Sequence, residues 1–323
     1  MTELIDLDTW LGYISDEYFR GYIPEGGASV KIAVLENATT TADIVEAVRT
    51  RATQHRLTTF QIDSRDVKVH MIDRVFFACA SQVPCARLTD YVLRRLASDE
   101  GFKSPGEVAP GASFAEALAI SSNVDREFVL QSLNKSIHDH VYRDRSMVRD
   151  FRLAMRQLCR NRLTGSSSSV AGNAAIEQWL TGRLTRMSEL KEMSIYSKIN
   201  RTNARLHLES LFHWIRVAKI DGTALVINLE QLVNGSTADT DGERYSRAAL
   251  LDAYEVLRQF IDSIDDLEGV MIICIAGAAI LDPDRRGRGL VTYQALRNRA
   301  YDEVRDRTHG NPVGSLVRIG SRP

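Results

Sequence analysis

The sequence predicts an α/β fold: a parallel sheet of about five strands, built from both ends of the chain and interrupted by a large helical insertion. Short apolar runs alternate with helical patterns at both ends of the chain, and this alternation is typical of a parallel sheet. The middle of the chain instead has helical periodicity almost throughout. We therefore assign residues 1–83 and 223–323 to the two parts of the core, and residues 84–222 to the insertion.

The first part of the core is expected to open with a helix. Residues 1–29 look helical as far as a Pro/Gly-rich turn, because their apolar side chains recur at helical spacing. The next two apolar runs, residues 29–36 and 58–63, are predicted as the first two strands. Between them, Thr40 and Thr41 can cap a helix, since a threonine hydroxyl accepts hydrogen bonds from the free N–H groups of a first turn.

The insertion and the second part of the core follow. Pro/Gly-rich residues 104–113 and Ser/Gly-rich residues 164–173 are expected to break the helical pattern of the insertion. The sheet pattern then returns in three runs separated by a helix and a loop. The strands are expected at residues 223–229, 269–278 and 315–319, with a helix at residues 245–264.

Composition excludes several classes of protein. A hydrophobic content of 44% and a charged content of 26% are ordinary for a soluble globular protein, and a net charge of −1 gives no global argument for a nucleic-acid partner. The opening residues do not resemble a signal peptide, and the longest apolar run, Val270–Leu281, is too short to span a bilayer. The four cysteines and the sequence His138-Asp139-His140 lack metal-ligand spacing. A cytoplasmic protein without a metal site or a membrane segment is therefore expected.

Residues 31–48 have the strand–turn–helix order of a phosphate-binding P-loop. That loop, G-x-x-x-x-G-K-[ST], needs glycines so that backbone N–H groups can surround a phosphate, a lysine for the β- and γ-phosphates, and a hydroxyl for Mg²⁺. The turn here reads Asn37-Ala38-Thr39-Thr40-Thr41-Ala42 and contains neither a glycine nor a lysine. An ordinary turn followed by a threonine cap is the alternative interpretation.

Two later strands also lack the expected polar residues. In P-loop ATPases of the additional-strand type, the strand opposite the loop ends in an Asp that holds Mg²⁺ through water and a Glu that polarises the attacking water. Here Asn228 and Leu229 occupy those places, and Glu230 follows. The next strand should end in a polar sensor residue, but it ends in Ala276-Gly277-Ala278-Ala279.

Several short motifs occur in an order that points to one family. They are Ile23-Pro24-Glu25-Gly26-Gly27, Leu190-Lys191-Glu192-Met193, Asn203-Ala204-Arg205, Ile220-Asp221-Gly222, Asp284-Arg285-Arg286-Gly287, the run from Tyr293 to Arg299, and Asn311-Pro312. In this order the chain resembles the ATP-binding P-loop proteins of bacterial BREX-type phage-defence clusters, which are related to AAA+ and Orc/Cdc6-like ATPases. The resemblance implies a P-loop NTPase-like core. It places the family's lysine on Thr41, its Mg²⁺ ligand on Ala42, and its Asp–Glu pair on Asn228 and Leu229.

These replacements lead to our preferred functional hypothesis. The resemblance implies a catalytically degenerate, pseudo-ATPase subunit of a bacterial anti-phage defence complex. It would assemble with itself or with other defence-complex subunits, including an active ATPase, without a required cofactor. Bound ATP and Mg²⁺ without hydrolysis stay possible, and so does an active ATPase in which Glu230 recovers metal or water contacts. The degenerate pocket positions would be Glu36, Thr39, Thr40, Thr41, Asn228 and Glu230.

Two arginine clusters are candidate contacts for a partner or for nucleic acid. Five arginines recur at spacings of three and four and would form one stripe on a helix: Arg145, Arg149, Arg152, Arg156 and Arg160. They favour phosphates or an acidic partner, so a DNA-binding module is a third hypothesis, and a solvated helix face is the simpler alternative. The second cluster is Arg285, Arg286 and Arg288. In oligomeric AAA+ relatives an arginine of this region reaches a neighbour's nucleotide; a basic surface turn is the alternative.

Overall fold

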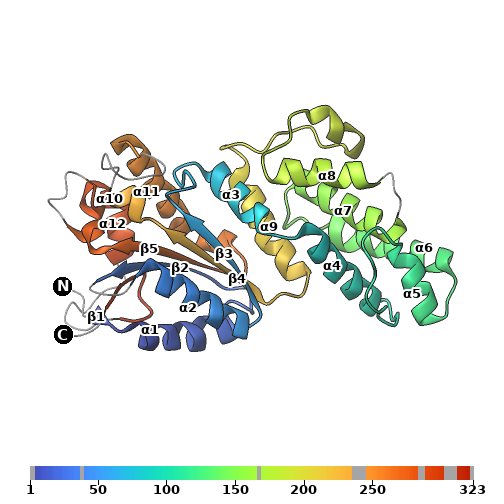
Figure 1. The fold of residues 1–323 in the computed structure, drawn as a ribbon, viewed down its shortest axis with the longest axis horizontal. Coiled ribbons are helices and arrows are strands. Elements are labelled where there is room, and N and C mark those ends of the chain that lie inside the picture. Colours follow the sequence, from blue (N-terminus) through green and yellow to red (C-terminus); the bar gives the residue numbers. More distant parts are fainter. Residues whose placement is uncertain are drawn as a thin grey trace. The chain divides into compact units, whose positions relative to one another are not determined.

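The computed structural model describes residues 4–36, 40–165, 169–234, 245–282, 288–301 and 311–320 (Figure 1). The chain divides into two compact units. Unit 1 comprises Met1–Cys79 and Ile220–Pro323, and unit 2 comprises Ala80–Lys219, where the sequence placed the boundaries at residues 84 and 222. Unit 1 contains a single sheet in which every strand pair is parallel, so the predicted α/β class and parallel sheet are confirmed.

The sheet of unit 1 has six strands in the order β1-β6-β2-β5-β4-β3. They are β1 (Leu4–Ile5), β2 (Ala28–Leu35), β3 (Leu57–Asp63), β4 (Gly222–Asn228), β5 (Val270–Gly277) and β6 (Leu316–Ile319). The prediction that residues 1–29 look helical up to the Pro/Gly-rich turn was wrong at β1, whose Leu4 pairs with Arg318 of β6. Two residues are too few to have a periodicity, and the strand forms through a partner far along the chain.

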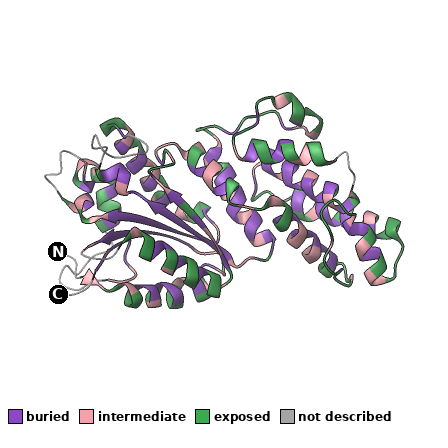
Figure 2. Ribbon diagram, in the orientation of Figure 1, coloured by how far each residue is buried: buried purple, intermediate pink, exposed green. Residues whose placement is uncertain are grey.

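Helices cover both faces of this sheet. Those of unit 1 are α1 (Leu7–Tyr13), continued by a π-helix (Ile14–Tyr22), α2 (Thr41–Gln54), α3 (Ile72–Ser81), α10 (Glu230–Asn234), α11 (Arg247–Asp262) and α12 (Gln294–Tyr301). Short 3₁₀ turns lie at Ile264–Asp266, Ala278–Leu281 and Leu290–Thr292. Helices α1 and α2 lie on one face, and α10 and α11 on the other (Figure 1). The central strands are therefore buried on both sides, which explains their continuous apolar runs (Figure 2).

The described residues of unit 2 contain helices and no strand. The helices are α4 (Cys85–Asp99), α5 (Phe114–Ser122), α6 (Arg126–Ile137) with a π-helical end (His138–Tyr142), α7 (Arg149–Thr164), α8 (Ser169–Leu180), a 3₁₀ helix (Met187–Met193) and α9 (Ala204–Val217). Helix α7 lies at the centre, in contact with α4, α5, α6 and α8. The predicted break at residues 164–173 is shorter than expected, because α8 already begins at Ser169 and buries Ile176 and Trp179.

Candidate functional site

The candidate site lies at the carboxyl edge of the sheet of unit 1. In a parallel sheet all strands end at the same edge, and ligands of open α/β sheets bind outside it. The register places Asp63 of β3 beside Asn228 of β4, and Leu35 of β2 beside Gly277 of β5. The sheet therefore brings the predicted positions after β2 and after β4 to one edge.

Both ends of the Asn228 amide are engaged by neighbouring groups. Its Nδ2 donates to Asp63 Oδ2 over 3.0 Å, and its Oδ1 accepts from the backbone N–H of Glu230 over 3.0 Å. The side chain is buried, with 4% of the residue exposed. Asn228 therefore caps the start of α10 and ties β4 to β3.

Asp63 is a site residue that the sequence analysis missed. Besides the bond from Asn228, its carboxylate accepts from Arg65 Nη2 over 2.8 Å and from the backbone N–H of Arg65 over 2.8 Å. Burial by itself would raise the pKa of Asp63, but the bonds from Arg65 and Asn228 hold that pKa below its ordinary value. The carboxylate is thus kept ionised and fully occupied. An acidic residue at the end of a predicted strand could have marked Asp63 as a candidate site residue. Its contact with Asn228 could not be predicted, because it depends on the register between β3 and β4.

Thr40 is the N-cap of α2, as the sequence predicted. Its Oγ1 accepts from the Asp43 backbone N–H over 3.2 Å and donates to Asp43 Oδ2 over 2.7 Å, while the Thr40 N–H donates to the same carboxylate over 3.0 Å. These reciprocal bonds form a capping box. Thr41 begins the helix, and its buried Oγ1 has no hydrogen-bond partner among the described residues. Thr39 lies outside the described residues.

The two glutamates of the predicted pocket differ in their contacts. Glu36 accepts from Arg318 Nε over 2.6 Å, and its backbone N–H donates to the Ile319 carbonyl over 2.8 Å, so it joins β2 to β6. Glu230 is the first residue of α10 and is half-buried. The pKa of Arg65 is raised, mainly by its bonds to Asp63 and less by the charge of Glu230. Glu230 therefore contributes negative charge to this edge.

The described residues at this edge lack the side chains with which a P-loop site holds Mg²⁺ and ATP. The sequence supplies no glycine or lysine in the turn after β2. The Asn228 amide is neutral and engaged by Asp63 and Glu230, and β5 ends in Gly277 and Ala278 without a polar side chain. Within the described ranges, no group of three or more His, Cys, Asp or Glu side chains is placed to hold a metal ion.

The arginine stripe is only partly as predicted. Arg145 lies in a turn before α7, so placing it on the helix was wrong. Arg152 Nη1 donates to the Tyr142 carbonyl over 3.1 Å, and the Arg156 guanidinium lies 5.0 Å from the centre of the Tyr142 ring. Both arginines are half-buried, whereas Arg149 and Arg160 are exposed. The middle of the stripe therefore packs inside unit 2, because α7 is buried on more sides than its apolar periodicity indicated.

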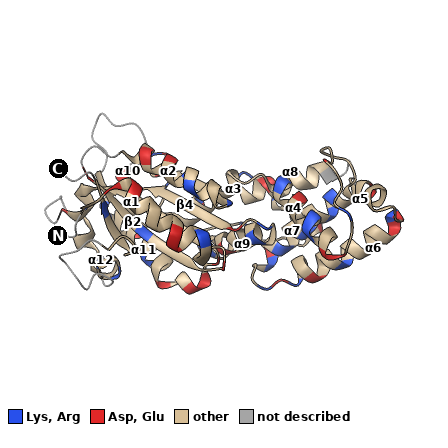
Figure 3. Ribbon diagram, turned by 90° about the horizontal axis from the view of Figure 1, so that it is seen from below, with Lys and Arg blue, Asp and Glu red and all other residues tan. Residues whose placement is uncertain are grey.

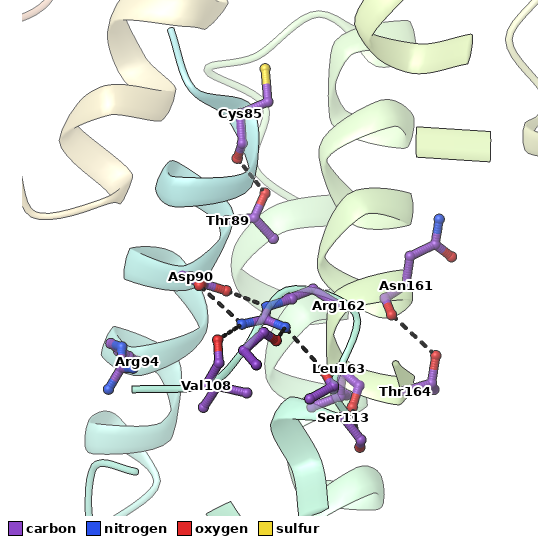
Figure 4. Close-up of polar contacts among 12 residues, drawn as sticks. Cys85, Thr89, Asp90, Arg94, Val108, Ser113, Asn161, Arg162, Leu163 and Thr164 are labelled. Carbon is purple, nitrogen blue, oxygen red and sulfur yellow. Dashed lines mark hydrogen bonds and ion pairs between the residues drawn. The ribbon is translucent and has the colours of Figure 1, made fainter. Parts of the chain in front are cut away.

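Arg162, another arginine of α7, makes several polar contacts within unit 2, and the sequence analysis did not predict them (Figure 4). It contacts Asp90 of α4 over 2.5 Å through Nε and over 3.1 Å through Nη2. It also donates to three backbone carbonyls of the segment before α5, those of Val108, Ala109 and Ala112. Arg162 thus joins α7, α4 and an irregular segment.

The second predicted cluster is described at Arg288 only, because Arg285 and Arg286 lie outside the described residues. The Arg288 guanidinium donates to the carbonyls of Leu232 over 2.7 Å, Val233 over 3.2 Å and Tyr245 over 3.1 Å. It therefore caps the carboxyl end of α10, and burial lowers its pKa. In this conformation Arg288 bonds backbone carbonyls of unit 1, and the predicted contact with a partner would require it to leave them.

Comparison with family models, with curated proteins and with solved structures gives no match for this chain. None of the helices in the described ranges combines the length and the apolar character needed to cross a membrane. The functional argument therefore depends on the residues of the two units.

Proposed function

We propose that unit 1 is a P-loop-like α/β unit that does not hydrolyse ATP, and that the protein is a structural or regulatory subunit of a larger assembly. The strand order supports the first part, since β5 lies between β2 and β4. An extra strand between the loop-bearing strand and the strand of the acidic pair is the arrangement that the additional-strand ATPases are named for. The assembly would be an anti-phage defence complex, as the resemblance to BREX-type proteins implies.

The observation that carries the proposal is the double engagement of the Asn228 amide. In an active site of this type, the corresponding Asp supplies negative charge and free oxygen atoms to the hydration shell of Mg²⁺. Asn228 has no charge, and its oxygen already accepts from Glu230 N–H. Each lost electrostatic contact of this kind typically costs about 3 kcal/mol of transition-state stabilisation. Losing the lysine, the Mg²⁺ ligands and the water-polarising acid together leaves no useful turnover.

Hydrolysis of ATP tests the enzymatic half of this proposal. Full-length protein is incubated with Mg²⁺ and ATP, and released phosphate is compared with a protein-free blank. We expect the two to be equal. Turnover that Glu230→Gln abolishes, and that the matched variant Glu46→Gln on α2 retains, would support the active ATPase instead. Glu46 is a suitable control because it is exposed and pairs only with the nearby Arg49 among the contacts described.

Purification under native salt tests the assembly half. The tagged chain is isolated from its own cells at low and moderate salt, and the eluate is separated by size. We expect a complex of fixed stoichiometry that contains an ATPase with an intact P-loop. A chain that elutes alone at every salt concentration and protein level would contradict the role as a subunit.

A further inference from the structure

The near-zero net charge of the chain conceals a strong separation of charge. Of its 41 basic and 42 acidic residues, 21 and 14 lie in residues 80–219, so unit 2 carries a formal charge of +7 and the rest of the chain −8. Within unit 2, residues 138–219 hold 15 basic and 7 acidic residues, against 6 and 7 in residues 80–137. The positive charge is therefore concentrated in the part of unit 2 that follows α6. Figure 3 shows Lys and Arg along α7 and in the chain segments near it.

Four of the seven acidic residues in this part are paired within unit 2, and one of them is Asp139, which pairs with Arg143 over 3.4 Å. Asp144 accepts from His213 Nε2 over 2.7 Å, Asp150 is buried and pairs with Arg149 over 3.0 Å, and Glu209 pairs with Arg205 over 3.0 Å. Asp144 and Glu209 contact His213 and Arg205, which are half-buried. Asp139 and Asp150 each contact one side of an exposed arginine, Arg143 and Arg149. Glu177, Glu189 and Glu192 are exposed as well, but the exposed lysines and arginines of this part outnumber them, so the net charge that a ligand meets is positive.

Five of the exposed cations lie in two segments that meet. One is the turn into α7, with Arg143, Arg145 and Arg149, and the other is the extended chain before α9, with Lys198 and Arg201. Arg149 Nη1 donates to the Ser194 carbonyl over 3.2 Å, which joins the second segment to the first. Two segments distant in sequence thus supply one basic surface.

An aromatic side chain accompanies these cations. Tyr196 lies between Ser194 and Lys198 and is 62% exposed, a large apolar area to leave in water. On the other segment the exposed ring of Tyr142 is supported by the Arg156 guanidinium beneath it. We define the basic–aromatic surface as Arg143, Arg145, Arg149, Tyr196, Lys198 and Arg201.

We propose that the basic–aromatic surface binds nucleic acid, and single strands in preference to duplexes. Separated arginines and lysines match the repeating phosphates of a backbone, and an exposed tyrosine ring offers a platform on which an unpaired base stacks. An acidic protein segment would use the same cations but would have no base to stack on Tyr196. This inference goes beyond the proposed function, since it concerns unit 2 and requires no nucleotide in unit 1.

The test measures fluorescence anisotropy of a labelled 30-nucleotide single strand, and of its duplex, with the full-length protein. Five phosphate contacts on a single strand predict that raising the salt from about 50 to about 200 mM weakens binding about 100-fold. The triple variant Arg145→Glu, Lys198→Glu, Arg201→Glu should lose at least about tenfold in affinity and flatten this salt dependence. No binding of either DNA by the unmodified protein at about 50 mM salt would overturn the proposal.

A charge-matched triple variant separates a specific surface from general charge. The variant Lys103→Glu, Arg126→Glu, Lys135→Glu makes the same charge change at exposed positions of residues 80–137, and it should bind within about twofold of the unmodified protein. Equal losses of DNA affinity in the two triple variants would contradict the proposed surface. Circular dichroism confirms that both variants are folded.

Tyr196→Ala distinguishes nucleic acid from an acidic protein partner. Loss of one stacked base should weaken single-strand binding about 5- to 100-fold and leave duplex binding nearly unchanged. If Tyr196→Ala has no effect and polyglutamate displaces the DNA at equal charge concentration, the surface is a docking site for an acidic protein, and the nucleic-acid proposal fails. None of these measurements involves ATP, so their outcome is independent of the hydrolysis test.

Discussion

The carboxyl edge of unit 1 and the basic–aromatic surface of unit 2 both carry polar side chains. At the edge these side chains bond other groups within the fold, whereas on the surface they face solvent. At the edge, Arg65 and Asn228 both donate to Asp63, Thr40 bonds Asp43, and Arg318 donates to Glu36. On the basic–aromatic surface, cations and a tyrosine ring remain exposed to solvent. A polar side chain that is engaged on every side stabilises the fold, whereas one that keeps free donors is available to a ligand. The comparison therefore directs functional tests to the exposed cations of unit 2, and stability tests to the engaged side chains of both units.

The largest expected effect comes from an arginine turned inward in unit 2. Arg162→Ala removes the ion pair with Asp90 and leaves that carboxylate and three carbonyls without their donor. We expect the free energy of unfolding of unit 2 to fall by about 3 kcal/mol. Arg160→Ala, two positions away and exposed, should change it by less than about 0.5 kcal/mol. Denaturant titration followed by circular dichroism measures both. Equal effects would remove the distinction between engaged and free arginines on α7.

A second effect is expected where an aspartate is introduced at position 228. Asn228→Asp places a second carboxylate about 3 Å from that of Asp63, and like charges at this distance raise one pKa strongly. A group whose pKa is raised in the folded state binds protons more readily there, so stability lost at neutral pH is regained in acid. We expect a deficit of about 2 kcal/mol at pH 7 that shrinks as the pH falls towards about 4. Thermal melts across this range measure it, with Asn134→Asp on exposed α6 as the control. A deficit independent of pH would contradict the repulsion between the carboxylates.

The smallest effect concerns the cap of α2. Thr40→Ala removes the hydroxyl that accepts from the Asp43 N–H and donates to the Asp43 carboxylate. The expected cost is about 1 kcal/mol in the stability of unit 1, and Thr40→Ser should recover most of it because serine also caps helices. Denaturant titration again measures the change. If the Thr40→Ala and Thr40→Ser variants are equally stable, the hydroxyl of Thr40 does not stabilise the helix as a cap. The turn after β2 would then again be a candidate ligand-binding loop.

Local signals in the sequence were sufficient for much of the fold. The β-branched and apolar runs of β2, β4 and β5 predicted buried parallel strands, and Thr40 predicted a helix cap, since both depend on neighbouring residues. The strand β1 was missed because it forms through pairing with β6 near the other end of the chain. Arg145 was misplaced because α7 begins only at Arg149, where the chain leaves the turn.

The site was harder to predict because its contacts are distant in sequence. Asp63 and Asn228 meet only through the register of β3 and β4, across a whole inserted unit. In the sequence, Arg288 looks like a basic residue of a surface turn. Its bonds to the carbonyls at the end of α10 appear only in the structure. The charge separation between the units, in contrast, was present in the sequence and was hidden by summing the charge over the entire chain.

The engagement of Asn228 has a consequence for how this chain can change over generations. Introducing an aspartate at position 228 alone would bring repulsion with Asp63 without any benefit in catalysis, because the turn after β2 contains no lysine or glycine. An ATP-hydrolysing site would require several substitutions at once, each of them harmful or neutral without the others. Such epistasis would make an ATP-hydrolysing site difficult to reach from this sequence by single substitutions.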